Sequence, residues 1–280
     1  MKIGVTGATG HLGRLVVEQL KERTNSKNIV ALVRSPEKAG DLGVEVRAFD
    51  YDKAETLKES LNNIDRLLLI SGSEVGQRAR QHKNVINAAK QVGIKWIVYT
   101  SLLHADTSSL SLAGEHLATE KALNESGIPH TVLRNGWYTE NYTGSIAGAL
   151  DAGAFIGSAG DGRISSAARA DFAEAAAVVI TNEDHMGKLY ELAGDESYTL
   201  SELASEISKQ SGKTIPYKNL PETEYAKILK SIGLPESISE AIASWDVCAS
   251  KGDLFNDSHQ LSKLIGRPTT PLSESVKAAL

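Results

Sequence analysis

The first thirteen residues of this 280-residue chain constrain its fold more than any other stretch. Residues 2–5 are strand-like, and glycines follow at Gly7, Gly10 and Gly13 before an apolar stripe of helical spacing over residues 12–20. Each glycine meets one need: a tight turn off the strand, bare backbone against a pyrophosphate, and close packing of the helix on the strand. The helix start would direct its free N–H groups at the phosphates. The stretch predicts a dinucleotide site, although a glycine turn can also join a strand to a helix without binding anything.

The first half of the chain alternates between strand-like and helical segments. Strands are expected at residues 28–33, 44–49, 66–70, 96–101 and 131–134, and helices at 12–20, 53–61, 80–92 and 117–123. This alternation predicts an α/β fold of the Rossmann type, in which helices cover both faces of a doubly wound parallel sheet. We expect residues 1–134 to form the dinucleotide-binding core. Residues 135–280 would form a smaller α/β substrate lobe, with some elements returning to pack on the core.

Composition excludes several classes of function. The net charge is −5 and the Lys and Arg residues are scattered, which gives no electrostatic footprint for nucleic acid. Cys248 is the single cysteine, so no intramolecular disulfide can form, and no Cys or His spacing resembles a metal site. The chain has no leader-like start and no apolar run near the roughly 20 residues that span a bilayer. We therefore expect a cytoplasmic protein without membrane contact.

Arg34 indicates which dinucleotide binds. It closes the expected second strand, about 20 positions past Gly13, where the side chain faces the adenosine ribose. An acidic residue there would bind the 2′-hydroxyl of NAD, whereas a guanidinium suits the 2′-phosphate of NADP, with Lys38 as a second cation. The alternative is a surface arginine at a strand end. Asp50, which closes the third strand, could meet the adenine amino group or simply begin a turn.

Two further loops follow strands at the crevice edge of the expected sheet. Residues 71–73 are small and would let a cofactor come close. Residues 135–142 gather aromatic and amide side chains where a nicotinamide and a substrate would lie. The alternative for the second loop is a hydrophobic plug that joins the two lobes.

Several blocks resemble a known family. The opening at residues 6–13, Arg34 and residues 133–138 together resemble the NmrA-like group of atypical short-chain dehydrogenases, and within it the type 2 bacterial NAD(P)H:quinone oxidoreductases. Residues 67–77, 99–107 and 249–255 carry the same likeness, which covers nearly the full length, with Asp253 as one departure. The resemblance implies NADPH as cofactor and a quinone as electron acceptor.

The resemblance also implies a set of cofactor contacts at the crevice. These are Gly7, Ala8, Thr9, Gly10, His11, Leu12, Arg34, Ser71, Gly72, Ser73, Asn135, Gly136, Trp137, Tyr138, Thr139 and Glu140. We add Arg169 as a candidate, which could hold a substrate oxygen or pair with Asp171 or another carboxylate.

The expected chemistry follows from a missing residue. Alcohol-oxidising members of the wider superfamily use a Tyr-x-x-x-Lys pair, but here Leu117 stands four positions before Lys121. Hydride delivery to an electron-poor quinone does not demand that acid, because water can supply the protons. Tyr138 and His104 are our candidate catalytic residues. His116 is a second histidine near the expected crevice, and for either histidine the alternative is a capped or solvated side chain.

Two other functions stay open at this point. Some NmrA-like proteins are redox sensors that bind dinucleotides without turning them over. Plant relatives reduce isoflavone-like or ether substrates with a pocket lysine, a role that only Lys121 could take. The expected partners are a small-molecule quinone and a second copy of the chain as a homodimer, although the sequence does not fix the oligomeric state.

Overall fold

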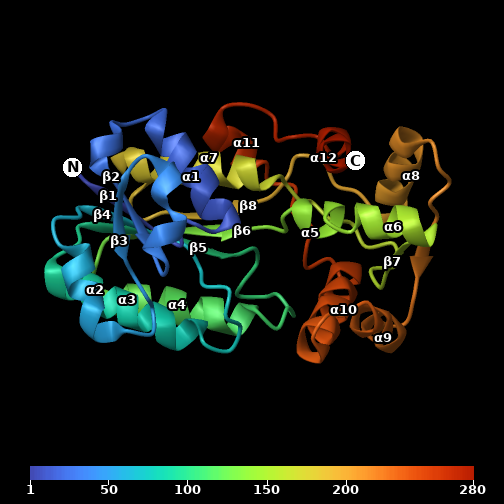
Figure 1. Cartoon of the computed structure of the whole chain (residues 1–280), viewed down its shortest axis with the longest axis horizontal. Helices are drawn as coiled ribbons and strands as arrows, with labels where there is room; N and C mark the ends of the chain where they lie inside the picture. Colours follow the sequence, from blue (N-terminus) through green and yellow to red (C-terminus); the bar gives the residue numbers. More distant parts are fainter.

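The computed structural model describes residues 1–280, and its core is a parallel sheet of seven strands (Figure 1). The strand order is β3-β2-β1-β4-β5-β6-β8. The strands are β1 (Ile3–Thr6), β2 (Ile29–Val33), β3 (Glu45–Ala48), β4 (Arg66–Leu69), β5 (Trp96–Leu102), β6 (His130–Asn135) and β8 (Leu189–Leu192). The direction of winding reverses between β1 and β4, which opens a crevice at their carboxyl ends. The predicted Rossmann-type sheet is confirmed.

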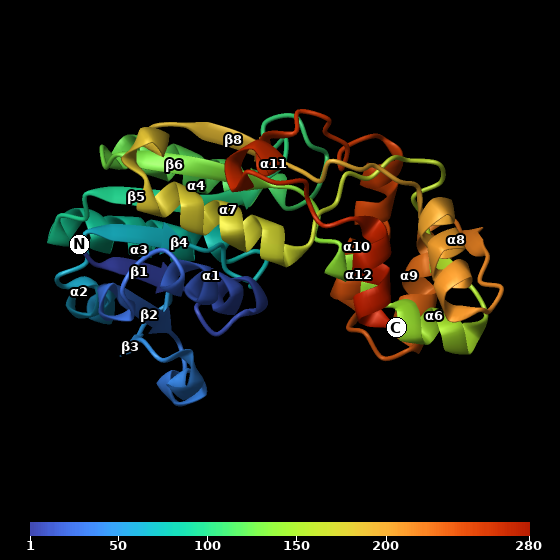
Figure 2. The same ribbon diagram turned by 90° about the horizontal axis from the view of Figure 1, so that it is seen from above.

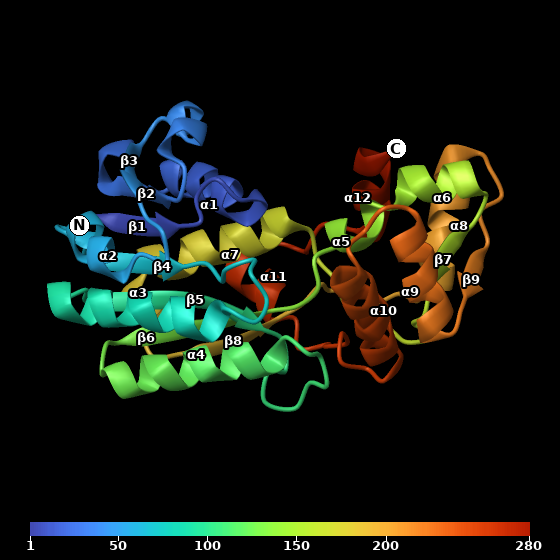
Figure 3. The same ribbon diagram turned by 60° about the horizontal axis from the view of Figure 1, so that its bottom comes forward.

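Helices cover both faces of the sheet (Figure 3). One face carries α1 (His11–Lys21), α7 (Arg169–Thr181) and α11 (Gln260–Ile265), and the other carries α2 (Ala54–Leu61), α3 (Arg78–Val92) and α4 (Ala113–Ser126). Successive residues of a strand point to opposite faces of the sheet, and because helices cover both faces, every residue of a central strand is buried. This is why the central strands are apolar throughout.

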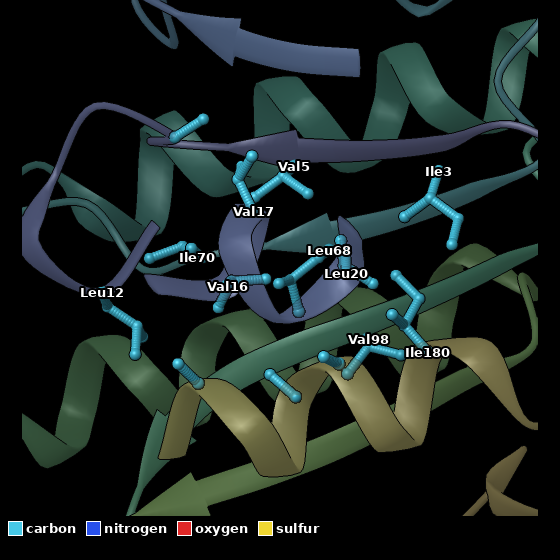
Figure 4. Close-up of a cluster of buried hydrophobic side chains, with 14 of the residues drawn as sticks. Ile3, Val5, Leu12, Val16, Val17, Leu20, Leu68, Ile70, Val98 and Ile180 are labelled. Atoms are coloured by element: carbon cyan, nitrogen blue, oxygen red, sulfur yellow. The ribbon is translucent and has the colours of Figure 1, made fainter. Parts of the chain in front are cut away.

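The core under α1 and α7 shows this arrangement (Figure 4). Leu68 of β4 and Val98 of β5 pack there with Val16 of α1, while their neighbours Leu67 and Ile97 belong to the cluster on the opposite face. The packing sets the height of α1 against the sheet, and so fixes the turn that precedes it.

A second lobe lies beyond the carboxyl ends of the strands (Figure 2). It contains α5 (Glu140–Thr143), α6 (Ile146–Ala152), β7 (Phe155–Gly157), α8 (Leu200–Ser211), β9 (Tyr217–Asn219), α9 (Glu222–Ser231), α10 (Glu236–Ser250) and α12 (Leu272–Ala279). Strands β7 and β9 form a small parallel sheet, with Ile156 opposite Lys218. The lobe has its own buried cluster, in which Phe155 packs with Leu203 and Ile207. This is the smaller α/β lobe expected from the sequence.

The chain passes repeatedly between the two lobes. It leaves the core after β6, returns through α7 and β8, leaves again for α8 to α10, and returns through α11 before ending in α12 (Figure 2). The returning helix α7 packs along α1. The division of the chain at residue 134 stays a prediction. No helix combines the length and the apolar character needed to cross a bilayer.

Candidate active site

A cleft of about 590 Å³ runs along the carboxyl edge of the sheet to the second lobe. Most of the expected cofactor contacts line it: Gly7, Thr9, Gly10, His11, Leu12, Arg34, Ser71, Gly72, Ser73, Asn135, Gly136, Trp137, Tyr138 and Arg169. The sequence analysis did not select several other lining residues: Tyr51, Glu74, Arg78, Gln81, Leu112 and Trp245. The cleft therefore joins segments that are far apart in the chain.

The glycine turn forms one end of the cleft. Gly7 has a φ of +60°, a left-handed conformation that favours glycine. A Cβ on Gly13 would lie 2.2 Å from the carbonyl oxygen of Gly7, so α1 packs against the turn as expected. Gly10 precedes α1 without a side-chain cap, which leaves the first N–H groups of the helix free to meet an anion.

Arg34, directly after β2, lines the cleft together with the glycine turn. Its side chain is 68% exposed, and its Nη1 lies 2.7 Å from Oε1 of Glu74. Lys38 and Asp50 also line the cleft here. Asp50 accepts the N–H of Asp52 at 3.1 Å, so it does begin a turn. A 2′-phosphate placed at Arg34 would have to share the guanidinium with Glu74 or displace it.

The small residues after β4 are held rigidly from behind. The N–H of Ser71 donates to Oγ1 of Thr100, and the N–H of Gly72 donates to Nε2 of His82, each at 2.9 Å. The Arg78 Nε donates to the carbonyl oxygen of Gly72 at 2.6 Å. These contacts present the backbone of residues 71–72 to the cleft in one conformation.

Arg78 has an unused donor. Its Nη1 is buried and has no hydrogen-bond partner in the protein. Burial lowers the pKa of the guanidinium, although Glu115 nearby opposes the change. A buried guanidinium N–H without a partner is costly unless a ligand supplies the acceptor. The signal in the sequence was a basic residue at the start of a helix, directly after the small-residue loop.

The loop after β6 forms the other end of the cleft. Oδ1 of Asn135 is also buried without a partner, while its Nδ2 lies 3.4 Å from the hydroxyl of Tyr138. Tyr138 packs edge-on against Phe172, and the Arg169 guanidinium lies 5.0 Å from the centre of its ring. Burial raises the pKa of the Tyr138 hydroxyl. The cleft thus offers an unused donor, Arg78 Nη1, and an unused acceptor, Asn135 Oδ1, in addition to the glycine turn at its other end. These groups fit a dinucleotide that carries phosphates at one end and an amide at the other.

The Arg169 side chain pairs with neither Asp171 nor another carboxylate, while a contact with a substrate oxygen stays a prediction because the residue lines the cleft. Asp171 instead binds Arg267 at 2.8 Å. Arg169 donates to Oδ1 of Asn141 at 2.9 Å and stacks on Tyr138. Its guanidinium therefore braces the Tyr138 ring on the cleft wall.

Three expected contacts do not line the cleft. Ala8 is fully buried in the core beneath the turn. Thr139 is buried, with its Oγ1 at 2.8 Å from Oγ of Ser166. Both carboxylate oxygens of Glu140 accept the backbone N–H of Arg169, at 2.9 and 3.1 Å, which caps the start of α7. These residues shape the walls from behind.

His104 also lies off the cleft. It has a φ of +53°, its N–H donates to Glu191, and its Nε2 lies 3.1 Å from the carbonyl oxygen of Phe255. Lys121 is 77% exposed beside Glu125 and does not line the cleft. The hypothesis of a reductase that uses a pocket lysine is therefore not supported by the structure. Two histidines line the cleft, His11 at the glycine turn and His116 of α4.

A buried polar layer supports His116. Its Nδ1 lies 2.8 Å from the hydroxyl of Tyr99, a fully buried residue of β5. His82 lies beside Tyr99, and its Nδ1 is 2.9 Å from Oγ1 of Thr119. Burial lowers the pKa of both histidines to about 3. Both rings are therefore neutral at physiological pH.

Two tryptophans close the cleft from the second lobe. Trp137 lies 5.6 Å from Trp245 of α10 in an edge-to-face pair, and Nε1 of Trp245 donates to Ser111 at 3.1 Å. The loop after β6 therefore both lines the cleft and joins the lobes, which combines the two interpretations of this loop.

Asp246, which follows Trp245 in α10, is buried and accepts hydrogen bonds from the N–H of Ser158 and the hydroxyl of Tyr142.

Comparison with known proteins agrees with this geometry. The model of the NmrA-like family matches residues 1–276. The chain belongs to the NmrA-like family. This member is 58% identical to Quinone oxidoreductase 2 of Escherichia coli over 277 residues, which cover 98% of this chain and 97% of that protein.

Solved structures of the NmrA-like fold match closely. An NADPH-dependent quinone oxidoreductase of E. coli, complexed with NADPH, superposes with a TM-score of 0.96 at 57% identity and 99% coverage of both chains. The triphenylmethane reductase of Citrobacter sp., complexed with NADP(H), has a TM-score of 0.96 at 40% identity and full coverage of both chains. Both reductases therefore share the fold of this chain.

Proposed function

We propose that this chain catalyses the reduction of quinones with NADPH bound in the cleft. The observation that carries the proposal is the likeness to a quinone oxidoreductase over nearly the whole of both chains, at 58% identity. The cleft supports it, because a glycine turn suited to phosphates, the cation Arg34 after β2 and the aromatic side chains of Trp137 and Tyr138 line it. The relatives reported above, at 40–58% identity, are reductases, so the sensor hypothesis is not carried forward.

The residues of the cleft divide the cofactor among them. The glycine turn would hold the pyrophosphate, Arg34 the 2′-phosphate, and Asn135 the nicotinamide amide through its free Oδ1. NADPH supplies a hydride from C4 of its nicotinamide. Tyr138, braced by Arg169 and Phe172, would form the wall against which the nicotinamide and the quinone lie. Catalysis is then mainly positioning and exclusion of water.

The experiment follows the loss of NADPH absorbance when a small benzoquinone is added, corrected for the uncatalysed rate, with NADH in parallel. Protein-dependent oxidation that favours NADPH supports both the activity and the Arg34 assignment. If NADPH binds in a titration and no quinone accelerates its oxidation, the catalytic proposal fails.

The location and the assembly are separate proposals. A cytoplasmic location is supported by the single buried cysteine, which requires no oxidising compartment. We also keep the homodimer and the absence of nucleic-acid binding as proposals. Size-exclusion chromatography with light scattering tests the first, and a gel-shift assay with duplex DNA and with RNA tests the second.

A further inference from the structure

We propose that His116 donates a hydrogen bond from Nε2 to the quinone oxygen that gathers negative charge during reduction, and that Tyr99 holds the ring in the tautomer this requires. The inference deepens the proposed function and rests on it. It also replaces His104 with His116 as the histidine of the reaction.

The hydrogen bonds fix which ring nitrogen carries the proton. The hydroxyl of Tyr99 is fully buried and lies 2.8 Å from Nδ1 of His116. Oγ1 of Thr119 is a second neighbour of this hydroxyl, but it already donates to the carbonyl oxygen of Glu115 and accepts from Nδ1 of His82. A buried hydroxyl hydrogen requires an acceptor, so Tyr99 donates and Nδ1 accepts. In a neutral imidazole the proton is then on Nε2. That atom has no partner within the protein, and His116 lines the cleft.

His82 shows that the opposite tautomer serves a different purpose. Its Nε2 accepts the N–H of Gly72, so its proton lies on Nδ1 and is donated to Oγ1 of Thr119. Both nitrogens of His82 are used inside the protein. His116 alone keeps a donor for a ligand.

The surroundings keep His116 neutral. Burial, the Arg78 guanidinium and His82 lower its pKa to about 3, and Glu115 of the same helix is engaged by the backbone N–H groups of Gly76 and Arg78. The ring is therefore a hydrogen-bond donor at neutral pH and not an imidazolium acid. A neutral donor that is held in place stabilises a developing oxyanion without having to reorganise.

The chemistry balances with water as the proton source. The quinone gains a hydride as the C4–H bond of the nicotinamide breaks. The product is the hydroquinone monoanion, whose negative charge lies on oxygen. His116 Nε2–H stabilises that charge on oxygen and keeps its own proton. One proton from solvent then completes the hydroquinone.

The test uses four variants with NADPH and two quinones, one electron-poor and one electron-rich. His116→Leu combined with Tyr99→Phe removes both partners of the buried pair, so no hydroxyl is left unsatisfied. We expect this double variant to lower kcat roughly 10- to 100-fold, because it loses one hydrogen bond to a charged oxygen, and the loss should be larger for the electron-rich quinone. The dissociation constant of NADPH should stay within about twofold, a difference too small to reflect a lost hydrogen bond.

His116→Gln keeps an N–H donor on the side chain and should recover part of the lost kcat. Tyr99→Phe alone leaves the His116 ring free to carry its proton on either nitrogen, and it should reduce kcat less than the double variant does. The ¹⁵N resonances of His116 should show a protonated Nε2 in the parent protein and a tautomer mixture in Tyr99→Phe. A merely structural role would not produce that spectroscopic change.

The matched control is His185→Gln, because Nδ1 of His185 makes the same contact with a tyrosine hydroxyl, that of Tyr190, at 2.7 Å, but lies outside the cleft. Its kcat should match that of the parent. If the parent protein reduces quinones and the double variant is equally fast, or if only NADPH binding weakens, the role of His116 is refuted and the proposed function stands. If the parent does not reduce quinones, both proposals fail.

Discussion

Replacing Arg34 with alanine should change which cofactor the protein prefers. The Arg34 side chain is 68% exposed and paired with Glu74. When a 2′-phosphate binds to the guanidinium, the loss of this ion pair offsets part of the binding free energy. Charge-assisted hydrogen bonds contribute about 1.5–3 kcal/mol, and an exposed ion pair contributes about 0.2–1 kcal/mol. The difference is about 1.5 kcal/mol, or roughly a 10-fold weaker NADPH dissociation constant, since 1.36 kcal/mol is tenfold.

The assay is a fluorescence titration of NADPH and NADH at low and at high salt. NADH lacks the 2′-phosphate, so its affinity should be nearly unchanged in Arg34→Ala, and the NADPH effect should shrink at high salt because the site is exposed. Glu74→Gln should act in the opposite direction and strengthen NADPH binding. Arg163→Ala removes another exposed, ion-paired arginine in the second lobe and serves as the control. Equal losses for NADPH and NADH in Arg34→Ala would refute the 2′-phosphate assignment.

Three further perturbations test other parts of the structure. Gly13→Ala places a Cβ 2.2 Å from the Gly7 carbonyl oxygen, so urea melts should show an unfolding free energy lower by about 1–3 kcal/mol or more. The same change should weaken NADPH binding. The control is Gly148→Ala in α6, whose Cβ would meet no atom within 4 Å and whose effect on stability should be neutral or favourable. Burial raises the pKa of Asp246 from 3.8 to about 6, so the folded protein holds this proton more tightly than the unfolded chain. The contribution of Asp246 to the unfolding free energy should therefore fall by about 3 kcal/mol as the pH rises from 3.8 to above 6. Urea melts should show this as a pH-dependent difference between the parent and Asp246→Asn, and a difference that does not change with pH would contradict it. Trp245→Ala removes the edge-to-face partner of Trp137 and should raise the quinone KM, measured by steady-state kinetics, about 2- to 10-fold. The NADPH dissociation constant, measured by titration, should not change. An unchanged quinone KM would contradict a role of α10 in substrate binding.

The sequence predicted the strands and the glycine turn because each depends on local physics. Apolar strand runs and the positive φ of Gly7 follow from nearby residues, and the structure has both. The small sheet of β7 and β9 was missed. Its strands are three residues long and pair across about sixty positions, so neither periodicity nor spacing indicates them.

The choice between the two histidines needed the tertiary structure. The buried face of α4 contains His116, Thr119 and Glu120, so its buried stripe is polar and the apolar spacing indicated a shorter helix. His104 looked equivalent in the sequence, but its left-handed backbone directs it toward Glu191 and Phe255. Only the packing of α4 against β5 decides which ring faces the cleft.

The sequence offered only a weak signal for Arg78, a basic residue at a helix start, and none for Trp245. Arg78 became informative only when its Nη1 was found buried and unpartnered. Trp245 reaches the cleft from a helix more than a hundred positions along the chain from Trp137. Such contacts are set by how the lobes pack, which no local pattern encodes.

The repeated passage of the chain between the lobes limits how such a protein can change. Since α7, β8 and α11 belong to the core but follow lobe segments in the chain, no single cut separates a complete sheet from a complete lobe. A cut after β6 would remove the edge strand β8 and the helix that packs on α1. The lobe therefore cannot be exchanged as one cassette by a single recombination event. New substrate preferences in this architecture are expected to arise by point substitutions and loop insertions around the cleft.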